Sequence, residues 1–143
     1  MRWAIPILLF WASTAAADHN WDHRNIVAGQ TIYADNCASC HGTNLEGQPN
    51  WQSSNANGVL PAPPHDQTGH TWHHDDELLL QYTKLGGAET LRQKGVTGFA
   101  SGMPGFDDIL TDAEIVAVLD FIKSTWSKKI QAMQSERSKS GDQ

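Results

Sequence analysis

Two cysteines and a histidine lie within residues 37–41, which read CASCH. The spacing C-x-x-C-H is the signature of covalent attachment of a c-type haem. Two thiols can add across the two vinyl groups of one haem, and two intervening residues let one helical turn present both sulfurs. The histidine that follows can then direct its imidazole at the iron. The motif predicts that Cys37 and Cys40 form thioether bonds and that His41 is the proximal iron ligand.

Two other kinds of site also use a C-x-x-C pair. A redox dithiol is expected near a β-α-β pattern, which this sequence does not show. Half of a zinc site needs a second pair of ligands at fingerlike spacing. The chain contains no other cysteine, and its histidines do not stand at that spacing. Haem attachment is therefore the interpretation that the motif favours.

The flanking residues extend the pattern. Residues 29–42 read GQTIYADNCASCHG, and residues 101–106, far downstream, read SGMPGF and precede a strong helical pattern. Together they resemble the class I (mitochondrial cytochrome c-like) family of single-haem c-type cytochromes, in a bacterial exported form. The resemblance covers about Asn25 to Trp126. It implies a small all-α cytochrome c domain, in which three main helices and haem-wrapping loops hold one covalent haem c.

Met103 is the predicted distal ligand of the haem iron. Its thioether is a soft donor, and a histidine–methionine pair raises the reduction potential relative to two histidines. The competing interpretation is a core methionine. The neighbours Gly102, Pro104 and Gly105 are not a helix or strand setting, and Met133 lies in a polar segment. The sequence therefore favours Met103 as ligand.

The first residues have the features of an export signal. Arg2 supplies a positive charge, residues 3–11 are an apolar run, and residues 15–17 are alanines suited to a cleavage site. We expect cleavage before Asp18. An uncleaved anchor is the alternative, although the apolar run is short for a membrane span.

This leader divides the chain into three parts. We expect residues 1–17 to be a cleaved signal peptide, residues 18–126 the cytochrome c domain, and residues 127–143 a polar C-terminal tail that extends the last helix briefly and then frays. An exported protein without a structural disulfide would be unusual for its size, unless haem consumes both thiols.

The formal net charge of −6 at pH 7 restricts the partners. It argues against nucleic acid and against anionic lipid. It fits steering toward a basic patch on a transient redox partner, or simple solubility. We therefore expect a monomeric periplasmic one-electron carrier with no membrane span after cleavage and no enzymatic turnover. The alternatives are a haem enzyme or gas sensor with a displaceable sixth ligand, and a cytochrome subunit of a larger oxidoreductase.

Three helices are predicted around these residues. Asn25 can cap a first helix that reaches the haem motif, and Asp75 to Leu85 form a second. Thr111 to Glu114 are a capping box that opens the last, whose apolar stripe comprises Ile115, Val118, Leu119, Ile122 and Trp126. The resemblance implies that Gly29 lets the first and last helices cross closely, with Tyr33 and Phe121 in the contact. Residues 88–100 are predicted to be a loop.

The long segment 42–71 is predicted to wrap the proximal side of the haem, with Leu45, Val59 and Leu60 as its apolar contacts. The resemblance implies a backbone carbonyl on the far nitrogen of His41, and Pro61 is the candidate. Such a bond fixes the ring and raises its basicity.

Four histidines follow the prolines of this segment: His65, His70, His73 and His74. They could ligate copper or zinc. We favour the alternative that they bond haem propionates, cap the next helix or face solvent.

Overall fold

The computed structural model describes residues 22–98 and 100–141, so the predicted signal peptide and its cleavage site lie outside the described residues. The described chain forms six α-helices and one 3₁₀ turn: α1 (His23–Asn36), α2 (Ala38–His41), η1 (Thr71–His73), α3 (Asp76–Leu85), α4 (Gly87–Gln93), α5 (Asp112–Ser124) and α6 (Lys128–Gly141). In these residues no strand forms, and a single parallel bridge joins Val59 to Ala100. The all-α fold class is confirmed. None of the helices in this part is both long and apolar enough to cross a bilayer.

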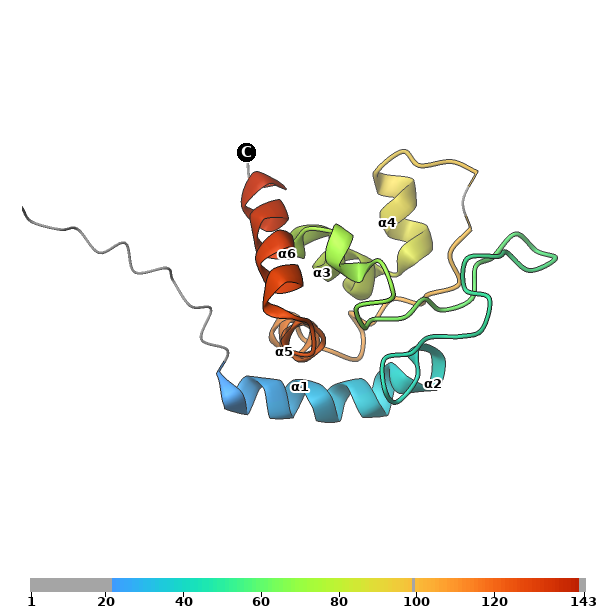
Figure 1. The fold of residues 1–143 in the computed structure, drawn as a ribbon. Helices are drawn as coiled ribbons and strands as arrows, with labels where there is room; N and C mark the ends of the chain where they lie inside the picture. Colours follow the sequence, from blue (N-terminus) through green and yellow to red (C-terminus); the bar gives the residue numbers. More distant parts are fainter. Residues whose placement is uncertain (1–21, 99, 142–143) are drawn as a thin grey trace, which may run out of the picture.

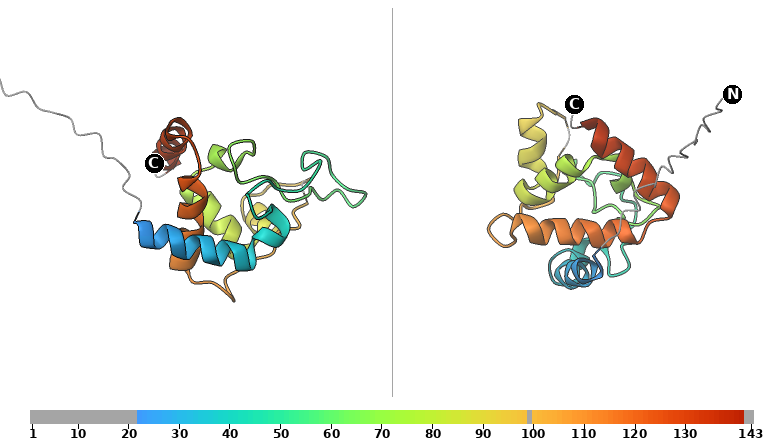
Figure 2. Two further views of the ribbon diagram at one scale, coloured as in Figure 1. Left: turned by 60° about the horizontal axis from the view of Figure 1, so that its bottom comes forward. Right: turned by 90° about the vertical axis from the view of Figure 1, so that its left-hand side faces the viewer.

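Helices α1 and α5 pack face to face and cross steeply, as Figures 1 and 2 show from perpendicular directions. Gly29 makes the close approach possible, because a Cβ added there would lie 1.9 Å from the carbonyl oxygen of Ala117. Nearby, the rings of Tyr33 and Phe121 meet with their centroids 5.5 Å apart. The predicted contact between the first and last helices is confirmed, and it forms the centre of the apolar core.

Helix boundaries follow local capping chemistry. The capping box of Thr111 and Glu114 is present in full, and the Asp75 side chain caps α3 by accepting from the Leu78 N–H. The predicted cap at Asn25 is wrong. Asp22 caps α1 instead, since its carboxylate accepts from the N–H of Arg24 at 3.0 Å. The side-chain amide of Asn25 forms a hydrogen bond with a residue of α5.

That partner is Asp120. The side-chain amide of Asn25 donates to its carboxylate at 2.6 Å. Both residue types at 22 and 25 are good caps, so the tertiary contact with α5 decides which one is used.

Helix α4 corrects the prediction that residues 88–100 form a loop. It begins after Gly86, whose φ of +82° ends α3, and Glu89 binds Arg92 and Gln93 along its exposed side. On its inner side the Thr90 hydroxyl donates to the carbonyl of Gln81 at 3.0 Å. Seven residues are too few for an apolar period to show, so the helix depends on these polar pairs.

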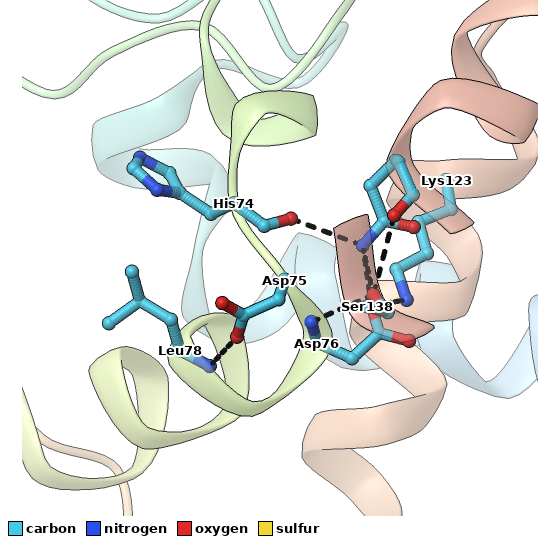
Figure 3. A network of polar contacts seen from close by, with 7 residues as sticks. His74, Asp75, Asp76, Leu78, Lys123 and Ser138 are labelled. Carbon is cyan, nitrogen blue, oxygen red and sulfur yellow. Dashed lines mark hydrogen bonds and ion pairs between the residues drawn. The ribbon is translucent and has the colours of Figure 1, made fainter. Parts of the chain in front are cut away.

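Helix α6 corrects the prediction of a fraying tail. It returns over η1 and α3, and its Gln134 is buried. The amide nitrogen of Gln134 lies 2.6 Å from the Asp76 carboxylate and 3.2 Å from the His74 carbonyl oxygen. Figure 3 shows Lys123 of α5 and Ser138 of α6 converging on Asp76. Lys123 is itself buried and pairs with the Asp76 carboxylate, so polar contacts hold α6 in place.

This network makes stability depend on acidity. Burial acts to raise the pKa of Asp76, but the hydrogen bond and charge of Lys123, together with hydrogen bonds from Gln134 and Ser138, outweigh it and lower the pKa. A carboxyl whose folded pKa is lowered stabilises the fold above its unfolded value, near 3.9, and this contribution is lost as the pH falls through the folded value. Asp76→Asn is expected to cost about 1–2 kcal/mol at pH 7, less than a fully buried pair because Asp76 is half-exposed.

Urea unfolding of the haem-loaded protein between pH 7 and pH 2 measures the difference in free energy of unfolding between the natural chain and Asp76→Asn. This difference should shrink toward zero below pH 4, as the natural carboxyl is protonated. Asp112→Asn is the matched control, because it removes a carboxylate from a surface pair with Lys84. A difference between Asp76→Asn and the natural chain that stays constant over the whole range would show that the Lys123 pair is not responsible.

Candidate haem-binding site

The two cysteines lie on the turn that follows α1, with Cys37 at the C-cap of α1 and Cys40 in α2. The N–H of Cys37 donates to the Tyr33 carbonyl at 2.8 Å, and the N–H of His41 donates to the Cys37 carbonyl at 2.9 Å. Cys37 is buried, Cys40 is exposed, and both thiols are free. Burial and the neighbouring Cys40 raise the pKa of the Cys37 thiol to about 11. Reactive dithiols need a lowered thiol pKa, so the surroundings do not favour a redox dithiol.

His41 is buried at the end of the same turn, and one of its two ring nitrogens is already used. Its Nδ1 lies 2.8 Å from the carbonyl oxygen of Pro63. A carbonyl only accepts, so Nδ1 carries the proton and Nε2 keeps a lone pair for a metal. Burial lowers the pKa of His41, and the Pro63 bond opposes that effect only in part. The neutral ring is the form that binds iron.

The carbonyl on His41 comes from Pro63, so the prediction of Pro61 is wrong. Gly47 explains the choice. Its N–H donates to the His41 carbonyl at 2.7 Å, and a Cβ on it would lie 2.7 Å from the carbonyl carbon of Pro63. With a φ of +69°, Gly47 lets the two backbones touch, and this contact delivers the Pro63 oxygen to the ring.

Segment 42–71 closes on itself beside α2. The N–H of Gln48 donates to the Ala62 carbonyl at 2.8 Å, and the Gln48 side chain accepts from the Ala62 N–H at 3.0 Å. Leu45 is buried in the core, whereas Val59 and Leu60 are only partly buried. The loop therefore positions His41 through its backbone more than through apolar side chains.

Met103 lies on a separate segment that α3 and α4 hold rigidly. Its carbonyl accepts from the Gly87 N–H at 3.1 Å, and its own N–H donates to the Ser101 hydroxyl oxygen, which also accepts from Tyr82 at 2.8 Å. A Cβ on Gly86 would lie 2.6 Å from the nitrogen of Gly105. A Cβ on Gly105 would in turn lie 2.8 Å from the carbonyl carbon of Leu85. Gly86 and Gly105 therefore allow the segment that bears Met103 to lie directly on the end of α3.

The loop that supports His41 through Pro63 contacts the segment that leads to Met103. The bridge between Val59 and Ala100 joins the loop after α2 to the segment before Met103. The structure therefore places Cys37, Cys40 and His41 within five consecutive residues, and the segment that bears Met103 adjoins the loop that supports His41.

Trp72 is a candidate site residue that the sequence did not indicate. Its indole Nε1 is buried and has no hydrogen-bond partner among the described residues. An orphaned buried donor costs about 1–3 kcal/mol, and a carboxylate on a bound group would satisfy it. The only sequence signal was a tryptophan within an otherwise polar, histidine-rich stretch.

The four histidines of the cluster have separate ring neighbours. His65 stacks on His41, His70 stacks on Trp51, and His73 lies on Trp72. His74 meets His70 edge-on at 5.4 Å. Within residues 22–98 and 100–141 no group of three or more His, Cys, Asp or Glu side chains is placed to hold a metal ion, so the geometry does not support a copper or zinc site here.

Comparison with known proteins gives one match. The family model described as Cytochrome c matches residues 26–126. No curated protein and no solved structure matches the chain. The matched region begins in α1 and ends directly after α5, so it contains every residue of the site described above.

Proposed function

Because the chain belongs to the cytochrome c family, whose members bind a covalent c-type haem, we propose that it is a periplasmic carrier of single electrons with His41 and Met103 as axial ligands. The observation that carries the proposal is the His41–Pro63 bond of 2.8 Å, which leaves Nε2 free beside two unpaired thiols. When bound, the haem supplies the one-electron chemistry, its iron alternating between the ferrous and ferric states.

Each residue has a distinct task in this proposal. Cys37 and Cys40 attach the porphyrin, and the single turn between them fixes its position. His41 donates its free Nε2, held in one tautomer by Pro63. Met103 supplies a thioether from a segment that hydrogen bonds to Ser101 and Gly87 keep in place. The buried Nε1 of Trp72, which has no partner among the described residues, would donate to a carboxylate of the bound haem.

Transfer to a partner requires an accessible haem edge. Cys40 is exposed, whereas Cys37 is buried, so the side of a bound haem attached at Cys40 would be the side nearer to a partner. A small and transient interface suits rapid exchange. The formal charge of −6 is compatible with steering toward a basic patch on that partner. With two axial protein ligands no iron position is left for a substrate, so we propose a monomeric carrier rather than an enzyme.

Protein film voltammetry of the haem-loaded protein tests this function. A carrier gives a reversible one-electron wave whose shape is unchanged when peroxide or nitric oxide is added. A catalytic current that grows with peroxide would instead assign the protein to haem enzymes, and a wave that shifts when nitric oxide is added would assign it to gas sensors. Accumulation in the cytoplasm with the leader intact would overturn the periplasmic assignment.

A further inference from the structure

The imidazole of His65 lies face to face with that of His41. Their ring centroids are 4.0 Å apart and the planes differ by 26°. The lone pair of Nε2 lies in the plane of the His41 ring, so a neighbour on the face of that ring does not obstruct a metal. His65 is thus placed where it can restrain the ring without competing for the iron.

His65 is itself held on several sides. Its Nδ1 lies 2.8 Å from the hydroxyl of Thr71. Its backbone N–H donates to the Leu45 carbonyl at 2.8 Å, and its carbonyl accepts from the indole Nε1 of Trp126 at 2.8 Å. The Tyr33 ring adds an edge contact, with centroids 6.3 Å apart. Leu45 and Trp126 are core residues, so the His65 ring is tied to the rigid centre of the domain.

The two contacts of His41 restrain different motions. The Pro63 bond fixes the position of Nδ1, but a single hydrogen bond still lets the ring plane rock about the line through that atom. The stacked His65 ring blocks this rocking, because tilting His41 would drive one ring into the other at a separation of 4.0 Å. It also covers one face of His41 against water.

We propose that His65 is a positioning residue that sets the plane of the His41 ring at the haem iron. The inference rests on the proposed function, since it presumes that His41 ligates iron. The orientation of an axial imidazole plane determines its overlap with the iron orbitals, and its shielding from water affects the reduction potential. A residue that only filled space would influence the stability of the fold but would not set the orientation of the His41 ring plane.

Two variants of the haem-loaded protein distinguish the stacked ring of His65 from its hydrogen bond to Thr71. His65→Ala removes the stacked ring, and His65→Phe retains a flat ring while losing the bond to Thr71. In the ferric protein, His65→Ala should shift and broaden the low-spin electron paramagnetic resonance g-values and lower the reduction potential, because water gains access to His41 and favours the more charged ferric state. His65→Phe should restore both signals. His23→Ala, at the exposed start of α1, is the control and should change neither.

The measurements distinguish failure of the positioning role of His65 from failure of the proposed function. If His65→Ala lowers only the unfolding temperature and leaves the g-values and potential unchanged, the positioning role is wrong. If His65→Ala fails to load haem, His65→Leu replaces it, since leucine fills much of the same space without a flat ring; unchanged g-values in that variant overturn the inference, and broadened ones support it. If the natural chain itself shows no histidine-ligated low-spin signal, the proposed function fails instead.

Discussion

Met103→Ala is expected to open the sixth coordination position of the haem iron. The thioether is then missing, and nothing else on residues 101–106 carries a soft donor. The reduced variant should bind carbon monoxide promptly, and its reduction potential should fall by at least ~100 mV, within the roughly 0.8 V range over which axial ligands set haem potentials. Carbon monoxide titration and voltammetry measure the two effects.

Met133→Ala is the matched control for Met103→Ala. Met133 is the other methionine among the described residues and lies exposed on α6, so its removal should leave both the potential and the response to carbon monoxide unchanged. Should Met103→Ala behave like this control, another residue must fill the sixth position, and the assignment of Met103 would be abandoned.

Gly29→Ala should have the largest effect on stability. Alanine in place of glycine normally favours a helix by up to about 1 kcal/mol. Here the added Cβ would lie 1.9 Å from the Ala117 carbonyl oxygen, and both groups belong to helix backbones that cannot move independently. Overpacking typically costs about 1–3 kcal/mol and occasionally more. A contact this short with a backbone oxygen places Gly29→Ala at the upper end of that range, so the net change should be strongly destabilising. Denaturant unfolding of the haem-loaded protein measures it.

Ala28→Val tests whether the effect is specific to the crossing point. Ala28 is the preceding residue of α1 and is exposed, so a larger side chain there should change the free energy of unfolding by only about 0.5 kcal/mol. Equal losses for the two variants would mean that α1 tolerates no enlargement anywhere, and the close approach at Gly29 would not be the cause.

The parts of the fold that could be predicted are those encoded by short spacings. The turn that unites Cys37, Cys40 and His41 requires five consecutive residues, and the capping box at Thr111 requires four. The contact between α1 and α5 was accessible from the resemblance, because Gly29 stands on the same helical face as Tyr33.

The parts that could not be predicted depend on contacts between distant segments. The choice of Pro63 over Pro61 is made by Gly47, through backbone contacts that no spacing reveals. Helix α6 docks through Gln134 and Asp76, so its inner side does not show the apolar period by which helices are recognised. In a polar stretch, the sequence alone could not distinguish an exposed end from a buried one.

The site residues missed from the sequence share a similar cause. The role of Trp72 depends on the burial of one nitrogen atom, and that of His65 on a stacking distance to a residue 24 positions earlier in the sequence. The histidine cluster drew attention as a possible metal site, yet its members turn to different ring partners once the loop has folded. Composition could indicate that these residues were unusual but not which neighbour each would find.

Visible absorption spectra of the purified haem-loaded protein test the central claim, that an electron carrier uses His41 and Met103 as axial ligands. The account predicts a sulfur-to-iron charge-transfer band in the oxidised form and no response of the reduced form to carbon monoxide. Absence of that band, together with prompt binding of the gas, would contradict it and would show an open sixth position suited to a sensor or an enzyme.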